Sequence, residues 1–198
     1  MGNHQSNNHN MHNKKKLTGG SLPATSWMEV LNPSLCLGQV RHAVFDFDGT
    51  LSVIRSGWEK VMIPLMIEAI CGGQAPDASI AAEVAEYVDC STGILTIKQM
   101  EWLEAAVRRH GLAGHVLTAR QYKKEYNERI LTPVRQRMNQ MDGSQASQDA
   151  LMLAGSRAFL QGLNDRGVTL YLVSGTDHIY VMEEAAALGI VDFFDGRI

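Results

Sequence analysis

Two short apolar runs constrain the fold of this 198-residue chain more than any other feature. The first is His42–Phe47 and the second is Val168–Val173, and polar or small residues follow each directly. Continuous apolar runs of this length are typical of buried strands in a parallel sheet. Helical patterns near residues 156–165 and 177–188 flank the second run, which produces the strand–helix alternation of α/β proteins. We therefore predict an α/β fold with a Rossmann-like parallel sheet.

A long helical insert separates the two predicted strands. Between residues 56 and 141, apolar residues recur at helical spacing in about four segments. A crossover between parallel strands needs a dozen or more residues, whereas here roughly 100 residues intervene. We predict an inserted α-helical cap domain at 51–150, with the sheet core assembled from 27–50 and 151–198.

Two local signals predict where helices of the insert begin or end. Thr96 is followed three residues later by Gln99, the spacing of a capping box at a helix start. Pro133 lies inside the helical pattern that begins near Ala119, and proline removes a backbone donor. We expect that helix to end or kink at Pro133.

Composition excludes several classes of function. The formal net charge is −3, which provides no broad basic surface for nucleic acid. No segment approaches the roughly 20 apolar residues of a membrane span. Residues 1–26 are rich in Asn, His, Lys, Gly and Ser, and we predict a disordered tail there. The odd, widely spaced cysteines indicate buried thiols in a reducing, cytoplasmic environment: Cys36, Cys71 and Cys90.

Polar side chains follow both predicted strands at the point where each strand ends. Asp46 and Asp48 come at the end of the first run, and Gly49 allows a sharp turn after them. Ser174 and Gly175 follow the second run and lead into a helix. Ligands of open α/β sheets bind at the carboxyl ends of the strands, and a helix start attracts anions. The pattern predicts a site for a phosphoryl group.

These residues carry a resemblance to a known family. Asp46-Phe47-Asp48-Gly49-Thr50, followed much later by Leu172-Val173-Ser174-Gly175-Thr176, resembles the first two motifs of the haloacid dehalogenase superfamily. The resemblance implies that Asp46 attacks phosphorus and that Asp48 donates a proton and later activates water. It also implies Mg²⁺ on the Asp46 carboxylate and the Asp48 backbone carbonyl, with Ser174 and Gly175 binding the phosphoryl group.

The resemblance leads to a specific functional expectation. The position of the insert is similar to that of the phosphoglycolate phosphatase and β-phosphoglucomutase branch. We expect a magnesium-dependent phosphatase that hydrolyses a small phosphorylated metabolite through an aspartyl-phosphate. A phosphomutase of the same superfamily and a catalytically inert fragment remain as alternatives. The oligomeric state is not predicted.

Two residues that follow the first motif are candidates for recognising the leaving group of the substrate. Arg55 and Trp58 lie where the resemblance implies a hinge and a substrate entrance. We predict that they bind substrate. The alternative is a solvated arginine and a tryptophan that anchors the first helix of the insert.

The third and fourth motifs of the superfamily are not recognised in the sequence. The resemblance implies a basic residue and an acidic pair downstream of the helix near Asp177, yet the chain ends at Ile198. Arg197 is too close to that helix to serve as the third motif, and we expect Asp192 and Asp195 to be turn residues around a short strand. We expect a C-terminally truncated chain that lacks roughly two further βα units.

Overall fold

The computed structural model describes residues 31, 32, 34 and 38–198, and the compact unit considered below is Arg41–Ile198. The predicted tail at 1–26, the predicted core boundary at residue 27 and Cys36 lie outside the described residues.

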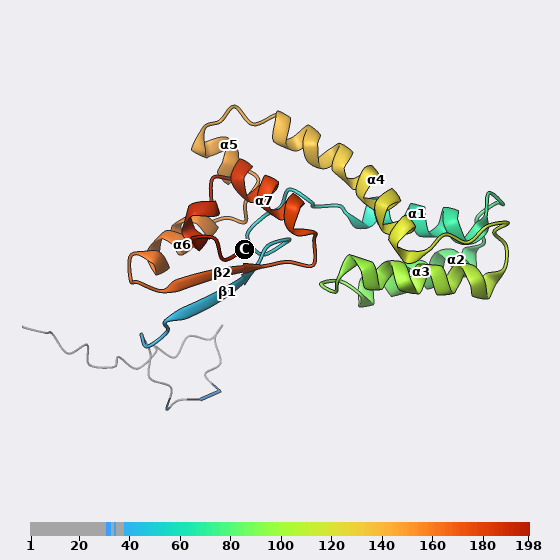
Figure 1. The fold of residues 1–198 in the computed structure, drawn as a ribbon, viewed down its shortest axis with the longest axis horizontal. Coiled ribbons are helices and arrows are strands. Elements are labelled where there is room, and N and C mark those ends of the chain that lie inside the picture. Colours follow the sequence, from blue (N-terminus) through green and yellow to red (C-terminus); the bar gives the residue numbers. More distant parts are fainter. Residues whose placement is uncertain (1–30, 33, 35–37) are drawn as a thin grey trace, which may run out of the picture. The chain divides into compact units, whose positions relative to one another are not determined.

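The two predicted strands form a parallel pair. They are β1 (His42–Asp46) and β2 (Thr169–Val173), which run side by side in Figure 1. The register aligns His42 with Thr169 and Asp46 with Val173. The two carboxyl ends are therefore level, so that the segments following them meet at one edge of the sheet.

Four helices occupy most of the connection between the strands, as predicted. They are α1 (Glu59–Cys71), α2 (Ala78–Cys90), α3 (Thr96–His110) and α4 (Ala119–Asn139). Helix α1 packs against the other three, and α3 packs against α4. Figure 1 shows α1, α2 and α3 grouped together, with α4 leading from them toward α5. The grouping follows from amphipathic spacing, because each helix buries one apolar face.

Four further elements complete the described part of the chain. They are α5 (Gln145–Asp149), α6 (Ser156–Asn164), α7 (His178–Ala187) and the 3₁₀ helix η1 (Val191–Phe194). Helix α6 packs against β2 and η1, and α7 packs against η1. The succession α6–β2–α7 beside a parallel strand fits a Rossmann-like core. None of the helices in the described part of the chain is both long enough and apolar enough to cross a membrane.

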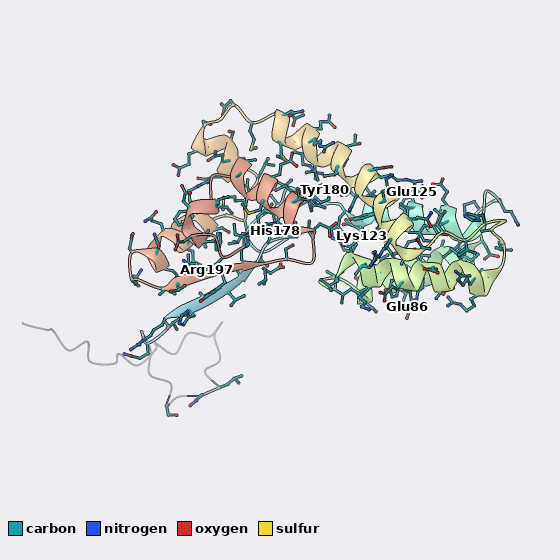
Figure 2. The ribbon with its side chains drawn as sticks, in the orientation of Figure 1. Glu86, Lys123, Glu125, His178, Tyr180 and Arg197 are labelled. Carbon is teal, nitrogen blue, oxygen red and sulfur yellow. The ribbon has the colours of Figure 1, made fainter. Side chains whose placement is uncertain are left out.

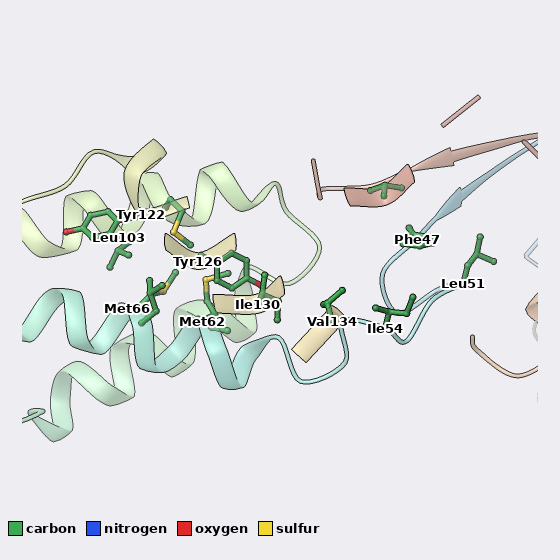
Figure 3. Packing of buried hydrophobic residues seen from close by; sticks show 14 of the residues in the cluster. Phe47, Leu51, Ile54, Met62, Met66, Leu103, Tyr122, Tyr126, Ile130 and Val134 are labelled. Carbon is green, nitrogen blue, oxygen red and sulfur yellow. The ribbon is translucent and has the colours of Figure 1, made fainter. Parts of the chain in front are cut away.

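One apolar core runs through the sheet and the helices. Phe47, Leu51 and Ile54, which follow β1, belong to the same buried cluster as Met62 of α1 and Ile130 of α4 (Figure 3). Each fully buried side chain of this size stabilises the fold by about 1.5–3 kcal/mol relative to exposure. The carboxyl end of β1 is therefore held firmly against the helical segment.

The predicted capping box at Thr96 is wrong. Thr96 is the first residue of α3, and its N-cap residue, Leu95, makes no side-chain capping bond. The side chain of Gln99 turns inward instead, where Nε2 donates to the Ser91 hydroxyl over 3.1 Å. Both residues are buried, and buried polar groups need partners, so this long-range contact prevails over the local cap. A capping box does form at α4, between Thr118 and Gln121.

Pro133 does not end its helix. Helix α4 continues through Pro133 to Asn139. Proline costs one backbone hydrogen bond, but Ile130, Leu131 and Val134 on either side of it are buried. Tertiary packing thus outweighs the local penalty.

Three smaller expectations are corrected or refined. Cys71 is buried as predicted, but Cys90, at the end of α2, is exposed. The expected short strand near Asp192 is a 3₁₀ helix, whereas Asp195 does occupy a turn, with φ of 48°. Arg197 packs over the Tyr171 ring and donates from Nε to the Leu170 carbonyl over 3.1 Å.

Candidate active site

The first acidic residue of the site ends β1. The Asp46 side chain is exposed, and its Oδ2 accepts a hydrogen bond of 3.1 Å from the Thr50 hydroxyl. The intervening Gly49 adopts φ of 77° and donates its N–H to the Ser52 carbonyl over 2.8 Å. A residue with a side chain adopts this backbone conformation only with strain. The glycine thus folds the loop so that Thr50 contacts Asp46.

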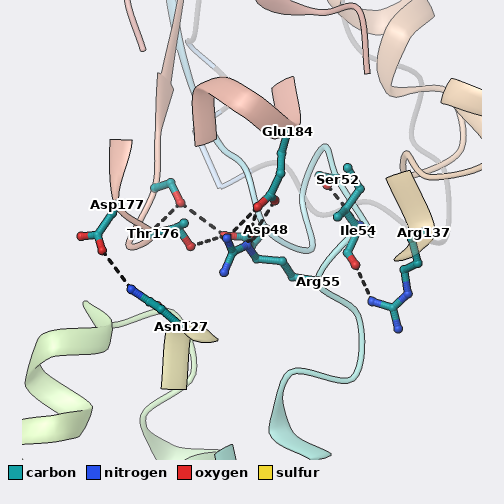
Figure 4. Close-up of polar contacts among 10 residues, drawn as sticks. Asp48, Ser52, Ile54, Arg55, Asn127, Arg137, Thr176, Asp177 and Glu184 are labelled. Carbon is teal, nitrogen blue, oxygen red and sulfur yellow. Dashed lines mark hydrogen bonds and ion pairs between the residues drawn. The ribbon is translucent and has the colours of Figure 1, made fainter. Parts of the chain in front are cut away.

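The second acidic residue is more enclosed. Asp48 Oδ2 accepts hydrogen bonds from Thr176 Oγ1 at 2.9 Å and from Ser174 Oγ at 3.3 Å (Figure 4). Its Oδ1 is buried without a hydrogen-bond partner among the described residues, and Arg55 Nε lies 3.9 Å away. Burial raises the pKa of Asp48 above its ordinary value, although Arg55 and the two hydroxyl groups oppose the shift. The negative charge of Asp46 raises it further.

The loop after β2 supplies the hydroxyl groups. Ser174 Oγ also accepts a hydrogen bond of 3.0 Å from the Thr176 backbone N–H. Because the single hydroxyl proton of Ser174 is directed at Asp48, it must turn before it can donate to a phosphoryl oxygen. The sequence had not singled out Thr176, although it directly follows the predicted Ser174-Gly175 pair.

Gly175 allows a close approach between two loops. A Cβ atom at this position would lie 3.2 Å from the carbonyl oxygen of Ile94, in the loop between α2 and α3. Contacts of this kind are tighter than most side chains tolerate. The glycine therefore lets the α2–α3 loop lie directly against the loop that follows β2.

A cavity of about 250 Å³ opens between these loops. Five of the six predicted site residues line it, namely Asp46, Asp48, Arg55, Trp58 and Gly175. The sixth, Ser174, is hydrogen-bonded to Asp48 and is not among the lining residues. Thr176 and Tyr126 line the same cavity, together with residues of the α2–α3 loop.

Comparison with protein families agrees with this geometry. A family model described as a hydrolase, haloacid dehalogenase-like hydrolase, matches residues 40–198, which include both strands and both loops. The chain belongs to the haloacid dehalogenase-like hydrolase family. Comparison with curated proteins gave no match.

In this haloacid dehalogenase-like hydrolase, a buried ion pair lies directly beside Asp48. Arg55 donates from Nε to both carboxylate oxygens of Glu184, at 3.0 and 3.1 Å, and from Nη2 at 2.6 Å. Arg55 is 7% exposed and Glu184 is 1% exposed, so the solvated alternative for Arg55 is wrong. Burial alone would lower the pKa of Arg55, but the hydrogen bonds and charge of Glu184 outweigh it and raise the pKa. The Tyr180 ring centroid lies 5.9 Å from the guanidinium carbon.

Sequence reasoning missed Glu184, although a signal was present. Val181, Ala185 and Leu188 are buried at the spacing of one helical face. Glu184 occupies the same face. A carboxylate on the apolar stripe of a helix is rarely buried without a partner. That position could have prompted a search for a buried cation.

Polar contacts also join α4 to the start of α7 and to the segment before α1. The Asp177 carboxylate, at the N-cap of α7, pairs with Lys123 and accepts a hydrogen bond of 3.3 Å from Asn127. Further along α4, Arg137 donates to the Ile54 carbonyl. Figure 2 shows Lys123 on α4 and His178 on α7, and Figure 4 shows the contacts of Asn127 and Arg137. Helix α4 is thereby held at two points along its length.

Proposed function

We propose that this hydrolase is a magnesium-dependent phosphatase that acts on a small phosphate monoester through an aspartyl-phosphate. One observation carries the proposal: an exposed Asp46 and an enclosed Asp48, two residues apart, line the same cavity at the carboxyl end of β1. Two carboxylates in such different surroundings suit two different chemical roles.

The proposed reaction has two steps. A carboxylate oxygen of Asp46 attacks phosphorus, the bond from phosphorus to the ester oxygen breaks, and protonated Asp48 donates its proton to that oxygen. Asp48 then takes a proton from water, which attacks the aspartyl-phosphate and releases inorganic phosphate. The raised pKa of Asp48 supports the donor role, because it increases the protonated fraction of the carboxyl group at a given pH.

The oxygen atoms at this site suit magnesium. The Asp46 carboxylate and the Asp48 backbone carbonyl are the groups that would hold the ion, and both are hard oxygen ligands. The unpartnered Oδ1 of Asp48 further indicates a site that a polar ligand completes. No cluster of three or more acidic, histidine or cysteine side chains occurs within the described residues, and Mg²⁺ commonly keeps several waters as ligands. The ion would supply positive charge that offsets the negative charge of the phosphoryl oxygens.

We further propose that residues 51–150 act as a helical cap over a core to which the described residues 41–50 and 151–198 belong. The supporting observation is that Trp58, Ile94 and Tyr126, all from the helical segment, line the cavity opposite the motif residues. In this arrangement Arg55 and Trp58 contact the substrate, and Ser174 and Gly175 bind its phosphoryl group. The likeness to the phosphoglycolate phosphatase and β-phosphoglucomutase branch belongs to the same proposal.

The test combines turnover with trapping of the intermediate. Wild-type protein should hydrolyse p-nitrophenyl phosphate with Mg²⁺ and lose that activity in EDTA. Asp46→Asn should abolish turnover and also prevent capture of beryllofluoride, a mimic of the aspartyl-phosphate. Asp192→Asn is the matched control, because Asp192 is exposed and does not line the cavity. Undiminished turnover by Asp46→Asn would refute the assignment.

A further inference from the structure

The hydroxyl group of Tyr126 has no hydrogen-bond partner among the described residues. Tyr126, on α4, is 4% exposed, and its ring packs among apolar side chains (Figure 3). The same residue lines the cavity. No hydrogen bond to its Oη is formed by any residue that the structure describes, and Oη is not among the buried polar atoms left without a partner. Because Tyr126 lines the cavity, its hydroxyl is open to a hydrogen bond with a molecule bound there.

Tyr122 provides an internal comparison. It lies one turn earlier on α4 and is 3% exposed, so it matches Tyr126 in helix, residue type and burial. Its hydroxyl accepts a hydrogen bond of 3.3 Å from the Leu117 N–H. Tyr122 does not line the cavity that contains Asp46 and Asp48. Of these two tyrosines of α4, the one that lines the cavity is therefore the one whose hydroxyl has no partner among the described residues.

Tyr126 is a hydrogen-bond donor and not an anion. Burial raises the pKa of Tyr126 well above its usual range, although the nearby Arg55 opposes the shift. The phenol is thus neutral and carries a proton that it can donate. Arg55 offers a second donor, because Glu184 engages Nε and Nη2 while Nη1 makes no hydrogen bond within the described part of the chain.

We propose that Tyr126 Oη, assisted by Arg55 Nη1, binds a hydroxyl oxygen of the leaving group close to the ester. The preferred substrates are then phosphate monoesters of small hydroxylated compounds and not of simple alcohols. Glu184 already compensates the charge of Arg55, which favours a neutral acceptor over a second anionic group. The cavity of about 250 Å³ favours a compact leaving group. This inference rests on the proposed phosphatase function and adds to it the recognition of the leaving group.

The experiment compares two esters that differ by one hydroxyl group. Wild-type kcat/KM should be about 10- to 100-fold higher for 2-hydroxyethyl phosphate than for ethyl phosphate, because only the first ester offers an acceptor to the Tyr126 hydroxyl. Tyr126→Phe should bring that ratio close to one. The substitution keeps the ring and removes a hydroxyl without a protein partner, so Tm should not fall. Tyr122→Phe, the matched control, should keep the wild-type ratio.

Three other outcomes would contradict the inference in part or in full. Hydrolysis of both esters with the same ratio in wild type and Tyr126→Phe would overturn the inference and leave the phosphatase proposal standing. If Tyr126→Phe instead weakened turnover of 2-carboxyethyl phosphate most, the assignment of a neutral acceptor would be wrong. Failure of wild-type protein to hydrolyse either ester or p-nitrophenyl phosphate would overturn the proposed function, and the inference with it.

Discussion

Arg55 and Glu184 lie 129 positions apart in the sequence and form a buried bidentate ion pair beside Asp48. The pair joins the segment before α1 to the middle of α7, so it connects the helical segment with an element of the core. Its bonds leave Arg55 oriented toward both the cavity and the second acidic residue of the site.

Removing one partner of this pair should destabilise the fold strongly. Glu184→Ala leaves the Arg55 charge buried without a counterion, which typically costs about 3–5 kcal/mol. Urea unfolding measures the loss. The double variant Arg55→Met/Glu184→Leu should lose less than Glu184→Ala, because no buried charge remains. A double variant that lost as much stability as Glu184→Ala, or more, would contradict this account.

Asp48→Asn should slow the hydrolysis of different substrates to different extents, depending on the leaving group. In the phosphorylation step, ethyl phosphate needs a donated proton and should slow by about 10²–10⁴-fold. The p-nitrophenolate ion leaves without a proton, so p-nitrophenyl phosphate should still show a burst of product followed by slow release of phosphate. Rapid-quench kinetics distinguish the two steps. Equal slowing of the phosphorylation step with both esters would argue against an acid role for Asp48.

The raised pKa of Asp48 also predicts how stability depends on pH. Folding favours the protonated carboxyl, so this contribution is fully present below the unfolded pKa of about 3.9 and is lost as the pH rises through the higher folded pKa. Asp48→Asn cannot ionise and should therefore unfold at higher denaturant concentration than wild type at pH 7. Below about pH 3.9 the advantage should vanish. Measurements in EDTA remove the influence of bound cations, and a pH-independent difference would count against the prediction.

Gly175→Ala should disturb the contact between the two loops that border the cavity. The added methyl group would approach the Ile94 carbonyl oxygen at 3.2 Å, which should displace the α2–α3 loop and cost about 1–3 kcal/mol. We expect kcat/KM to fall on the order of tenfold or more, because small displacements of binding groups slow the reaction. Gly114→Ala is the control, since a Cβ there meets no atom within 4 Å. Equal effects of the two substitutions would show that the Ile94 contact is unimportant.

Local chemistry explains why much of the fold and the motif positions were predictable. Apolar runs identified β1 and β2, and helical spacing identified α1 to α4, α6 and α7, because burial on one face of an element is a local property of the sequence. Parallel strands in register bring their carboxyl ends level, so Asp46, Asp48 and Gly175 were expected at one edge of the sheet. The structure places all three on one cavity.

Tertiary contacts decided what local patterns could not. Gln99 does not form the expected capping box and instead donates a hydrogen bond to the buried Ser91 hydroxyl. Helix α4 continues through Pro133 because the residues on either side of the proline are buried. Both cases have the same physical reason, namely that burial in the folded protein outweighs a local preference of about 1–3 kcal/mol.

By itself, the sequence determined the strand and helix pattern and the two acidic residues at the strand end, because those depend on near neighbours. Only the tertiary structure supplied Thr176 as a partner of Asp48 and Glu184 as the partner of Arg55, and only it placed Tyr126 on the cavity. Both contacts join segments that lie far apart in the chain. Whether a buried polar group has a partner depends on what folding brings beside it, and no local pattern encodes that neighbour.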